Sequence, residues 1–153
     1  MRVCFAGLLT LALLNMASLG CRGRSQPPGP PLAPVSGTVT LDDKPLVGAA
    51  VTFLPIGTTK GRICYGVTDQ NGRYELAMDG QYKGAPAGQF LVLCNKWVMP
   101  DGSDIPPDSK LSAVELGAKE LLPPRYSQEE TSELRATVPP NGGTFDFKLT
   151  SRP

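Results

Sequence analysis

The chain has 153 residues, of which 41% are hydrophobic, and this fits one globular domain with a modest core. Its formal net charge of +1 at pH 7 offers no basic surface for nucleic acid, so no nucleic-acid partner is expected. The chain contains no histidine, which excludes His-based zinc sites and catalytic centres that use a histidine base. We therefore expect a non-catalytic protein without metal or cofactor, although carboxylate, lysine or cysteine chemistry stays open.

The first 20 residues have the features of a signal peptide. Arg2 supplies a positive start, and the apolar stretch 3–14 that follows is shorter than the ~20 residues needed to span a bilayer. Ser18-Leu19-Gly20-Cys21 resembles a bacterial lipobox, except that Ser18 stands where Leu is usual. We expect cleavage before Cys21, lipidation of Cys21, and export as a membrane-anchored lipoprotein that faces the periplasm or the outer cell surface. An ordinary signal peptide cut near the same point is the alternative.

Residues 21–34 are expected to form the lipidated cysteine and a tether. The segment 22–34 holds five prolines in thirteen residues, so it cannot form a helix or a β-ladder. As a polyproline II spacer at ~3.1 Å per residue it would reach on the order of 40 Å from the anchor.

From Val35 onward, apolar and polar residues alternate with the period of a strand that is buried on one face. Strands are predicted at 35–41, 49–54, 63–68, 73–77, 89–95 and 144–149. Turn residues separate most of these runs, and the abundance of Gly and Pro, 17 and 16 residues, agrees with many turns. The pattern predicts an all-β fold, an antiparallel β-sandwich over residues 35–150.

The segment 96–140 interrupts this alternation before the last strand. Ser112 and Glu115 match a capping box, and Val114, Ala118 and Leu121 follow at helical spacing before two prolines. We expect a helix of two to three turns here, within a long, partly helical insertion.

The run Asp69-Gln70-Asn71-Gly72 has two interpretations. As a calcium loop counted from Asp69 it fails, because Arg73 stands at position 5, where an EF-hand needs an oxygen ligand, and Tyr74 stands at position 6, where it needs glycine. As a turn it fits well, because Asn-Gly favours positive φ and Asp69 can accept bonds from backbone amides two residues on. We expect a hairpin that joins strands 63–68 and 73–77.

Cys64 and Cys94 each fall within a predicted strand. A disulfide is allowed in an exported protein and would close a loop of about 30 residues, a contribution of roughly 3 kcal/mol. The alternative is two buried free thiols that act as small apolar residues. Strand register decides between the two.

Trp97 follows the strand 89–95 and is a candidate ligand contact, since an aromatic ring can stack on a sugar. A lone Trp that covers the edge of a sandwich is the more common alternative. The nearby Asp101, Asp104 and Asp108 are interpreted as solvated loop charges, because catalysis or cation binding would need paired, buried carboxylates.

Several stretches resemble the carboxypeptidase regulatory-like domain, a transthyretin-like and immunoglobulin-like sandwich found in short secreted lipoproteins of planctomycete-type bacteria. The resemblance lies in residues 35–53, 68–74 and 85–90, with further likeness at 121–127 and 141–147. Two positions depart from the family: Asp43 stands where Gly is usual in the first turn, and Phe90 where Tyr is common. Asp43 would then adopt a tight, left-handed conformation. The resemblance implies no catalytic residues.

Together these features predict a non-catalytic lipoprotein of the cell envelope with a structural or protein-interaction role. Its expected partners are the membrane, through the lipid anchor, and an envelope protein or glycan. A carbohydrate-binding module that uses Trp97 is the alternative, and a hydrolase that relies on carboxylates is a third.

Overall fold

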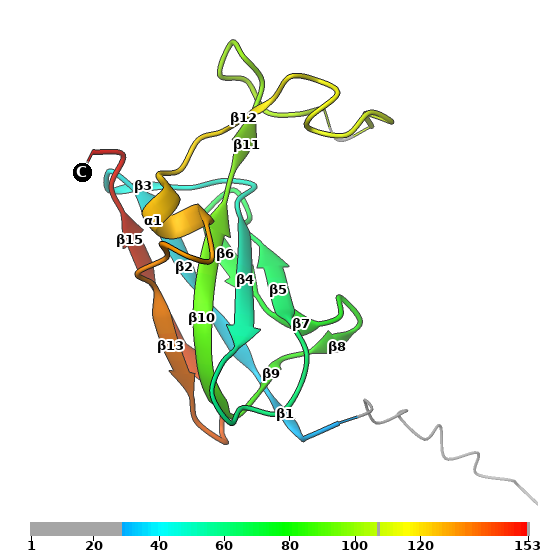
Figure 1. The fold of residues 1–153 in the computed structure, drawn as a ribbon, viewed down its shortest axis with the longest axis vertical. Helices are drawn as coiled ribbons and strands as arrows, with labels where there is room; N and C mark the ends of the chain where they lie inside the picture. Colours follow the sequence, from blue (N-terminus) through cyan, green and yellow to red (C-terminus); the bar gives the residue numbers. More distant parts are fainter. Residues whose placement is uncertain (1–28, 107, 153) are drawn as a thin grey trace, which may run out of the picture.

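The computed structural model describes residues 29–106 and 108–152. Over these residues the chain forms two packed β-layers with very little helix (Figure 1). The prediction of an all-β sandwich is confirmed.

The larger layer is a six-stranded sheet in which every neighbouring pair is antiparallel. Its strands, in spatial order, are β13 (Arg135–Val138), β10 (Gly88–Asn95), β4 (Ala50–Pro55), β5 (Cys64–Val67), β7 (Ala77–Met78) and β8 (Tyr82–Lys83). The predicted strands at 49–54, 63–68 and 89–95 correspond to β4, β5 and β10.

The smaller layer is built around β2 (Val35–Leu41). On one side β2 pairs antiparallel with β6 (Arg73–Glu75) and β3 (Lys44–Pro45). It also pairs in parallel with β14 (Gly143–Thr144) and β15 (Phe147–Leu149). The parallel pairing of the last strand departs from the antiparallel arrangement that was expected, because alternation shows which face a side chain takes but not the direction of the neighbouring strand.

Two short pairs and one helix complete the fold. β1 (Leu32–Ala33) pairs with β9 (Ala85–Pro86), so the expectation that residues 22–34 form no β-ladder is wrong for Leu32 and Ala33. β11 (Trp97–Val98) pairs with β12 (Lys119–Glu120). Figure 1 shows these two pairs at opposite ends of the long axis of the sandwich. The helix α1 (Pro124–Ser127) lies against β10, and its Tyr126 joins the core.

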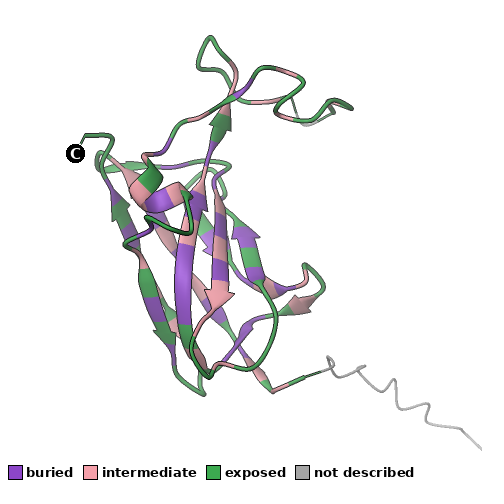
Figure 2. Ribbon diagram, viewed as in Figure 1, coloured by how far each residue is buried: buried purple, intermediate pink, exposed green. Residues whose placement is uncertain are grey.

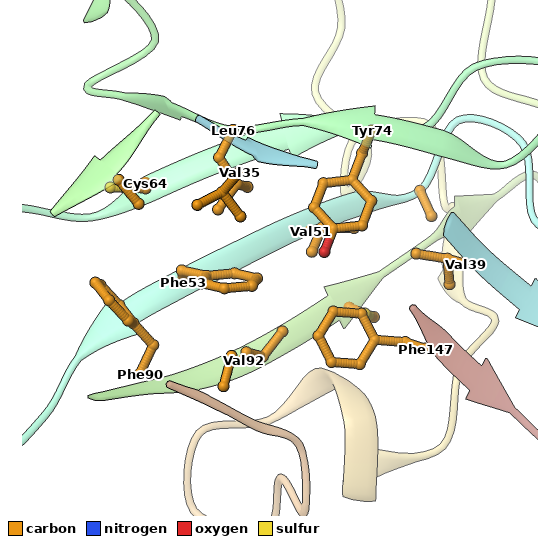
Figure 3. Close-up of a cluster of buried hydrophobic side chains, with 14 of the residues drawn as sticks. Val35, Val39, Val51, Phe53, Cys64, Tyr74, Leu76, Phe90, Val92 and Phe147 are labelled. Carbon is orange, nitrogen blue, oxygen red and sulfur yellow. The ribbon is translucent and has the colours of Figure 1, made fainter. Parts of the chain in front are cut away.

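Buried residues line the strands of both layers (Figure 2), and aromatic rings lie in the space between the layers (Figure 3). Phe53 lies at the centre, with its ring centroid 5.6 Å from that of Phe90, 6.0 Å from Phe145 and 6.2 Å from Phe147. Tyr74 stacks on Phe147 at 6.4 Å. Burial of each such ring contributes about 1.5–3 kcal/mol, so this cluster is a main source of stability.

A buried polar contact joins the two edges of the smaller layer. The Tyr74 hydroxyl donates to the Phe145 carbonyl at 2.7 Å, across the inner face of β2. Gly37 of β2 leaves room for this carbonyl, since a Cβ there would lie 1.8 Å from the Phe145 oxygen. In the break between β14 and β15, the Asp146 carboxylate accepts from the Thr38 amide of β2 at 2.8 Å. This bond takes the place of a backbone ladder bond to β2 at that point.

The turn from β2 to β3 has the left-handed conformation expected at Asp43. Asp42 and Asp43 have φ of 49° and 63°, the pair of positive values that a type I′ turn requires. The Asp42 carboxylate accepts from the amide and hydroxyl of Ser151, at 3.0 and 2.6 Å. These bonds hold the pKa of Asp42 below its ordinary value.

The predicted helix after Ser112 is wrong in length. The capping box does form, since Glu115 accepts from the Ser112 amide at 2.8 Å and donates its own amide to the Ser112 hydroxyl at 3.3 Å. Gly117, at φ 69°, ends the helical segment after a single turn. The Ala118 amide then donates to the Ala113 carbonyl, as in a Schellman motif. Start and stop signals lie too close together for a helix to extend between them.

The α-helix instead begins at the prolines that were expected to end one. Pro124 occupies the first turn of α1, where a missing amide hydrogen costs nothing. The expected long helical insertion is therefore absent from the described residues, and a single helical turn stands in its place.

Candidate functional site

The Asp69 turn, first considered as a calcium loop, uses its carboxylate to bind its own backbone. Asp69 Oδ1 accepts from the amides of Asn71 and Arg73 at 2.8 and 2.9 Å, and Gly72 has φ of 72°. The turn interpretation is therefore confirmed.

The hairpin that this turn was expected to make is only partly formed. β5 belongs to the larger sheet, whereas β6 crosses to pair with β2 in the smaller one. After Leu76 the chain returns, and β7 pairs with β5. The crossing brings the Glu75 carbonyl close above Gly66, where a Cβ would lie 2.3 Å from that oxygen. A glycine is therefore needed at position 66.

Cys64 and Cys94 are both free and buried. They lie on opposite sides of β4, because Cys64 pairs with Phe53 and Cys94 with Val51. Two strand spacings of ~4.8 Å place their Cα atoms about 10 Å apart, beyond the ~7 Å that a disulfide tolerates. The two cysteines therefore form no disulfide. Burial raises the pKa of the Cys64 thiol to about 11 and that of Cys94 to about 12.

Trp97 lies on β11, in a two-stranded ribbon that extends beyond the end of the sandwich (Figure 1). The side chain is 41% exposed. Leu121 at the end of β12 and Val114 in the loop between the ribbon strands are also exposed. The ribbon and its loop thus expose one aromatic and two aliphatic side chains to solvent.

Glu120 fastens the base of this ribbon to β10. Its carboxylate accepts from the amides of Lys96 and Leu122, at 2.8 and 3.0 Å, and from the Asn95 side-chain nitrogen at 3.0 Å. Glu120 lies beside Lys119 in the sequence with no motif around it, and only its position in the fold reveals this role.

Lys96 has a second fastening role that the sequence did not indicate. Its side chain is only 10% exposed, and its ammonium pairs with the carboxylate of Asp104. Asp104 also bridges to Val98 on the backbone. The ion pair therefore holds the loop after β11 against the sandwich. Asp104 is a solvated loop charge as expected, with its side chain 68% exposed, and the pairing with Lys96 is the part that the sequence did not indicate.

Asp101, in the loop after β11, also makes a defined contact. Its carboxylate accepts from the hydroxyl and amide of Ser103, at 2.6 and 2.9 Å, and these bonds lower the pKa of Asp101. Across residues 29–106 and 108–152, His, Cys, Asp and Glu do not gather in a group of three or more that could hold a metal ion.

A shallow polar groove of about 500 Å³ crosses the outer face of the smaller sheet. Hydroxyls and charged groups of β2, β6 and β14 dominate its walls. The lining residues are Ser36, Gly37, Thr38, Val67, Asp69, Arg73, Tyr74, Glu75 and Thr144. Asp69 and Thr38 already bind within the fold.

Neither a protein-family model nor a curated protein matches the chain. Among solved structures, a 9R-lipoxygenase from Cyanothece PCC8801 aligns with 22% identity and a TM-score of 0.35, over 78% of this chain and 16% of that one. The chain thus spans about a sixth of the lipoxygenase, and the likeness is too low to carry a conclusion.

Cys21, the expected site of lipidation, and the signal peptide before it lie outside the described residues. Among the residues that are described, no helix is long and apolar enough to span a membrane.

Proposed function

We propose that this chain is a non-catalytic lipoprotein of the cell envelope. In this proposal residues 1–20 are removed as a signal peptide, Cys21 carries the lipid, and residues 21–34 tether a carboxypeptidase regulatory-like sandwich that spans residues 35–150. The sandwich binds another envelope protein.

The observation that carries the proposal is the position of the chain start relative to the ribbon. β1, near the start of the described residues, lies at one end of the long axis, and β11, the ribbon strand that carries Trp97, lies at the other (Figure 1). A chain anchored through its N-terminal segment would hold its ribbon away from the membrane, where a partner can reach it.

The ribbon has the construction expected of a binding element. Its base is fixed by Glu120 and by the ion pair of Lys96 with Asp104, while Trp97 and Leu121 stay exposed. A supported loop with an exposed aromatic residue loses little conformational entropy when a partner binds, and Trp is common among residues that dominate binding energy.

The anchor is tested by labelling cells with a fatty-acid analogue. The wild-type chain should take up the label and sediment with membranes, and Cys21→Ala should do neither. An unlabelled wild-type chain, or label that survives in Cys21→Ala, would show that the protein is not anchored through Cys21.

The interaction is tested by cross-linking and affinity capture from intact envelopes. Trp97→Ala should reduce capture of the partner by tenfold or more, because loss of a dominant Trp contact costs about 2 kcal/mol or more. Lys148→Ala, a change on an exposed residue of β15, serves as the matched control. Equal capture by both variants would exclude the ribbon as the binding surface.

A second candidate function rests on the same exposed indole. Trp97 offers a ring face on which a sugar could stack, which is how a carbohydrate-binding module would use it. A glycan array separates the two functions, because specific glycan binding that Trp97→Ala abolishes would favour the carbohydrate module. A blank array with retained protein capture favours the first proposal.

A further inference from the structure

The outer face of the larger sheet carries a row of exposed apolar side chains. Ile63, Tyr65 and Val67, at and beside β5, are 48%, 45% and 60% exposed. They project away from the core because the intervening Cys64 and Gly66 face inward.

The neighbouring strands extend this row into a continuous neutral surface. On β4, Thr52 pairs with Tyr65 and Ala50 pairs with Val67; on β7, Ala77 pairs with Tyr65. Beyond β4, Leu93 of β10 lies beside Thr52. None of these residues is charged, and the nearest ionic group along the strands lies at the edge of the face, where Lys83 of β8 pairs with Ala77.

The two outer faces of the sandwich differ sharply. The outer face of the smaller sheet carries Arg73 and Glu75 on β6, Thr38 on β2 and Lys148 on β15. In a two-layer sandwich a solvated face normally has such polar residues, and an apolar face normally packs against another element. The larger sheet is therefore the layer that lacks a cover.

We propose that a second copy of this chain covers the face formed by β10, β4, β5 and β7, in a two-fold dimer. Two independent arguments select a second copy: the charge of the face, and the direction in which the chain leaves it. Only the second depends on the lipid anchor proposed above.

The charge argument concerns residues near the two-fold axis. A two-fold contact places residues near the axis against their own copies, so a charged residue there would meet a like charge. Here the central residues are Tyr65, Thr52 and Ala50, which are neutral. Two Tyr65 rings can pack against each other, an arrangement that aromatic side chains favour.

The direction argument concerns where the chain begins. The strands of this face run along the long axis of the molecule, and β1 lies at one end of that axis (Figure 1). A two-fold axis parallel to the strands places both copies of β1 at the same end, so both anchors can enter one membrane. A dimer formed through the ribbon ends would place the two anchors at opposite ends.

The size of the face indicates a weak dimer. Four strands about 4.8 Å apart, the longest of 8 residues and the shortest of 2, form a face of at most roughly 20 by 25 Å. This is smaller than the ~800 Å² that each partner buries in a standard interface. Anchoring in one membrane raises the local concentration of copies, which lets a weak contact be populated.

The experiment uses the full chain as the cell processes it, purified in detergent micelles. Sedimentation should show a dimer that increases with protein concentration, and Tyr65→Lys should raise its dissociation constant about tenfold or more. Thr40→Lys, on the outer face of β2, should leave the constant unchanged. Thermal unfolding of both variants verifies that each is folded.

A photo-cross-linking residue at Val67, compared with one at Lys148, identifies the face in intact envelopes. Position 67 should give a product of two copies, and position 148 should give none. Equal products from both positions, a product of position 67 with a different protein only, or a chain that stays monomeric up to about 1 mM in micelles would each overturn the dimer. Micelles require no lipid on Cys21, so failure of the anchor is distinguishable from failure of the dimer.

Discussion

Replacement of Tyr74 by Phe tests how the two edges of the smaller layer are joined. The change keeps the ring that stacks on Phe147 and removes only the hydroxyl that donates to the Phe145 carbonyl at 2.7 Å. Tyr74 is 2% exposed, so water cannot readily replace the lost donor. A buried carbonyl left without its partner costs about 1–3 kcal/mol, and we expect the free energy of unfolding to fall by that amount.

The assay is equilibrium unfolding in urea at pH 7, with Tyr65→Phe as the matched control. Tyr65 is 45% exposed, so removal of its hydroxyl should change the free energy of unfolding by less than about 0.5 kcal/mol. If Tyr74→Phe is as stable as Tyr65→Phe, the hydroxyl contributes no net energy and the reasoning fails.

The same variant has a signature at alkaline pH. Burial, followed by the charges of Cys94 and Asp146, raises the pKa of Tyr74 far above its ordinary value of 10.0. Since the folded state keeps the proton more tightly, this stability is fully present below pH 10 and is lost as the pH rises further, by about 1.4 kcal/mol per unit. Tyr74→Phe should lose less stability than the wild type between pH 10 and 11. An equal loss in both proteins would show that Tyr74 ionises freely in the folded state.

Three further predictions follow from burial and backbone geometry. Because the pKa values of Cys64 and Cys94 in the folded protein are about 11 and 12 instead of 9.0, both thiols should resist alkylation at pH 8 in the native protein and react after unfolding. The stability that these protonated thiols contribute should be lost as the pH rises from 9 through these values. Intact mass after alkylation counts the free thiols, and a bridged pair would contradict the structure. In urea unfolding, Asp43→Gly should leave the free energy of unfolding equal or raise it by up to about 1 kcal/mol, because glycine adopts a positive φ without strain. Asp42→Gly should lower the free energy of unfolding, since only Asp42 binds Ser151. A more stable Asp42→Gly than Asp43→Gly would be inconsistent with the turn. Glu120→Ala should speed hydrogen exchange at the amides of residues 96 and 122 without unfolding the sandwich, and unchanged exchange there would disprove the role of this carboxylate.

Much of the fold could be predicted because its signals are local. Strands β2, β4, β5 and β10 follow from alternation along a few residues, and the left-handed turn at Asp43 follows from its position between two such runs. Each of these elements is determined by side chains that are close in the sequence.

The remainder depends on contacts between distant residues. Nothing near Phe147 shows that β15 runs parallel to β2, and nothing near Arg73 shows that β6 crosses to the other sheet. The glycines at 37 and 66 are local traces of these crossings, because each makes room for a carbonyl from another part of the chain. Without that partner strand, a glycine in a strand has several explanations.

The candidate site divides in the same way. The exposure of Trp97 follows from its place beyond a core strand, so it could be considered from the sequence. The support beneath it could not, because Lys96 and Glu120 are brought together across 24 residues and look like ordinary surface charges when taken alone.

The arrangement of β2 also determines how the sandwich would respond to mechanical force. β2 directly follows the residues expected to form the tether, and it has the antiparallel β6 and β3 as well as the parallel β14 and β15 as partners. A pull on the tether is directed along this strand, so it loads the flanking hydrogen bonds together in shear and does not open them one at a time. The strand nearest the membrane would therefore act as a mechanical clamp, and tension on the anchor would meet its greatest resistance where it enters the domain.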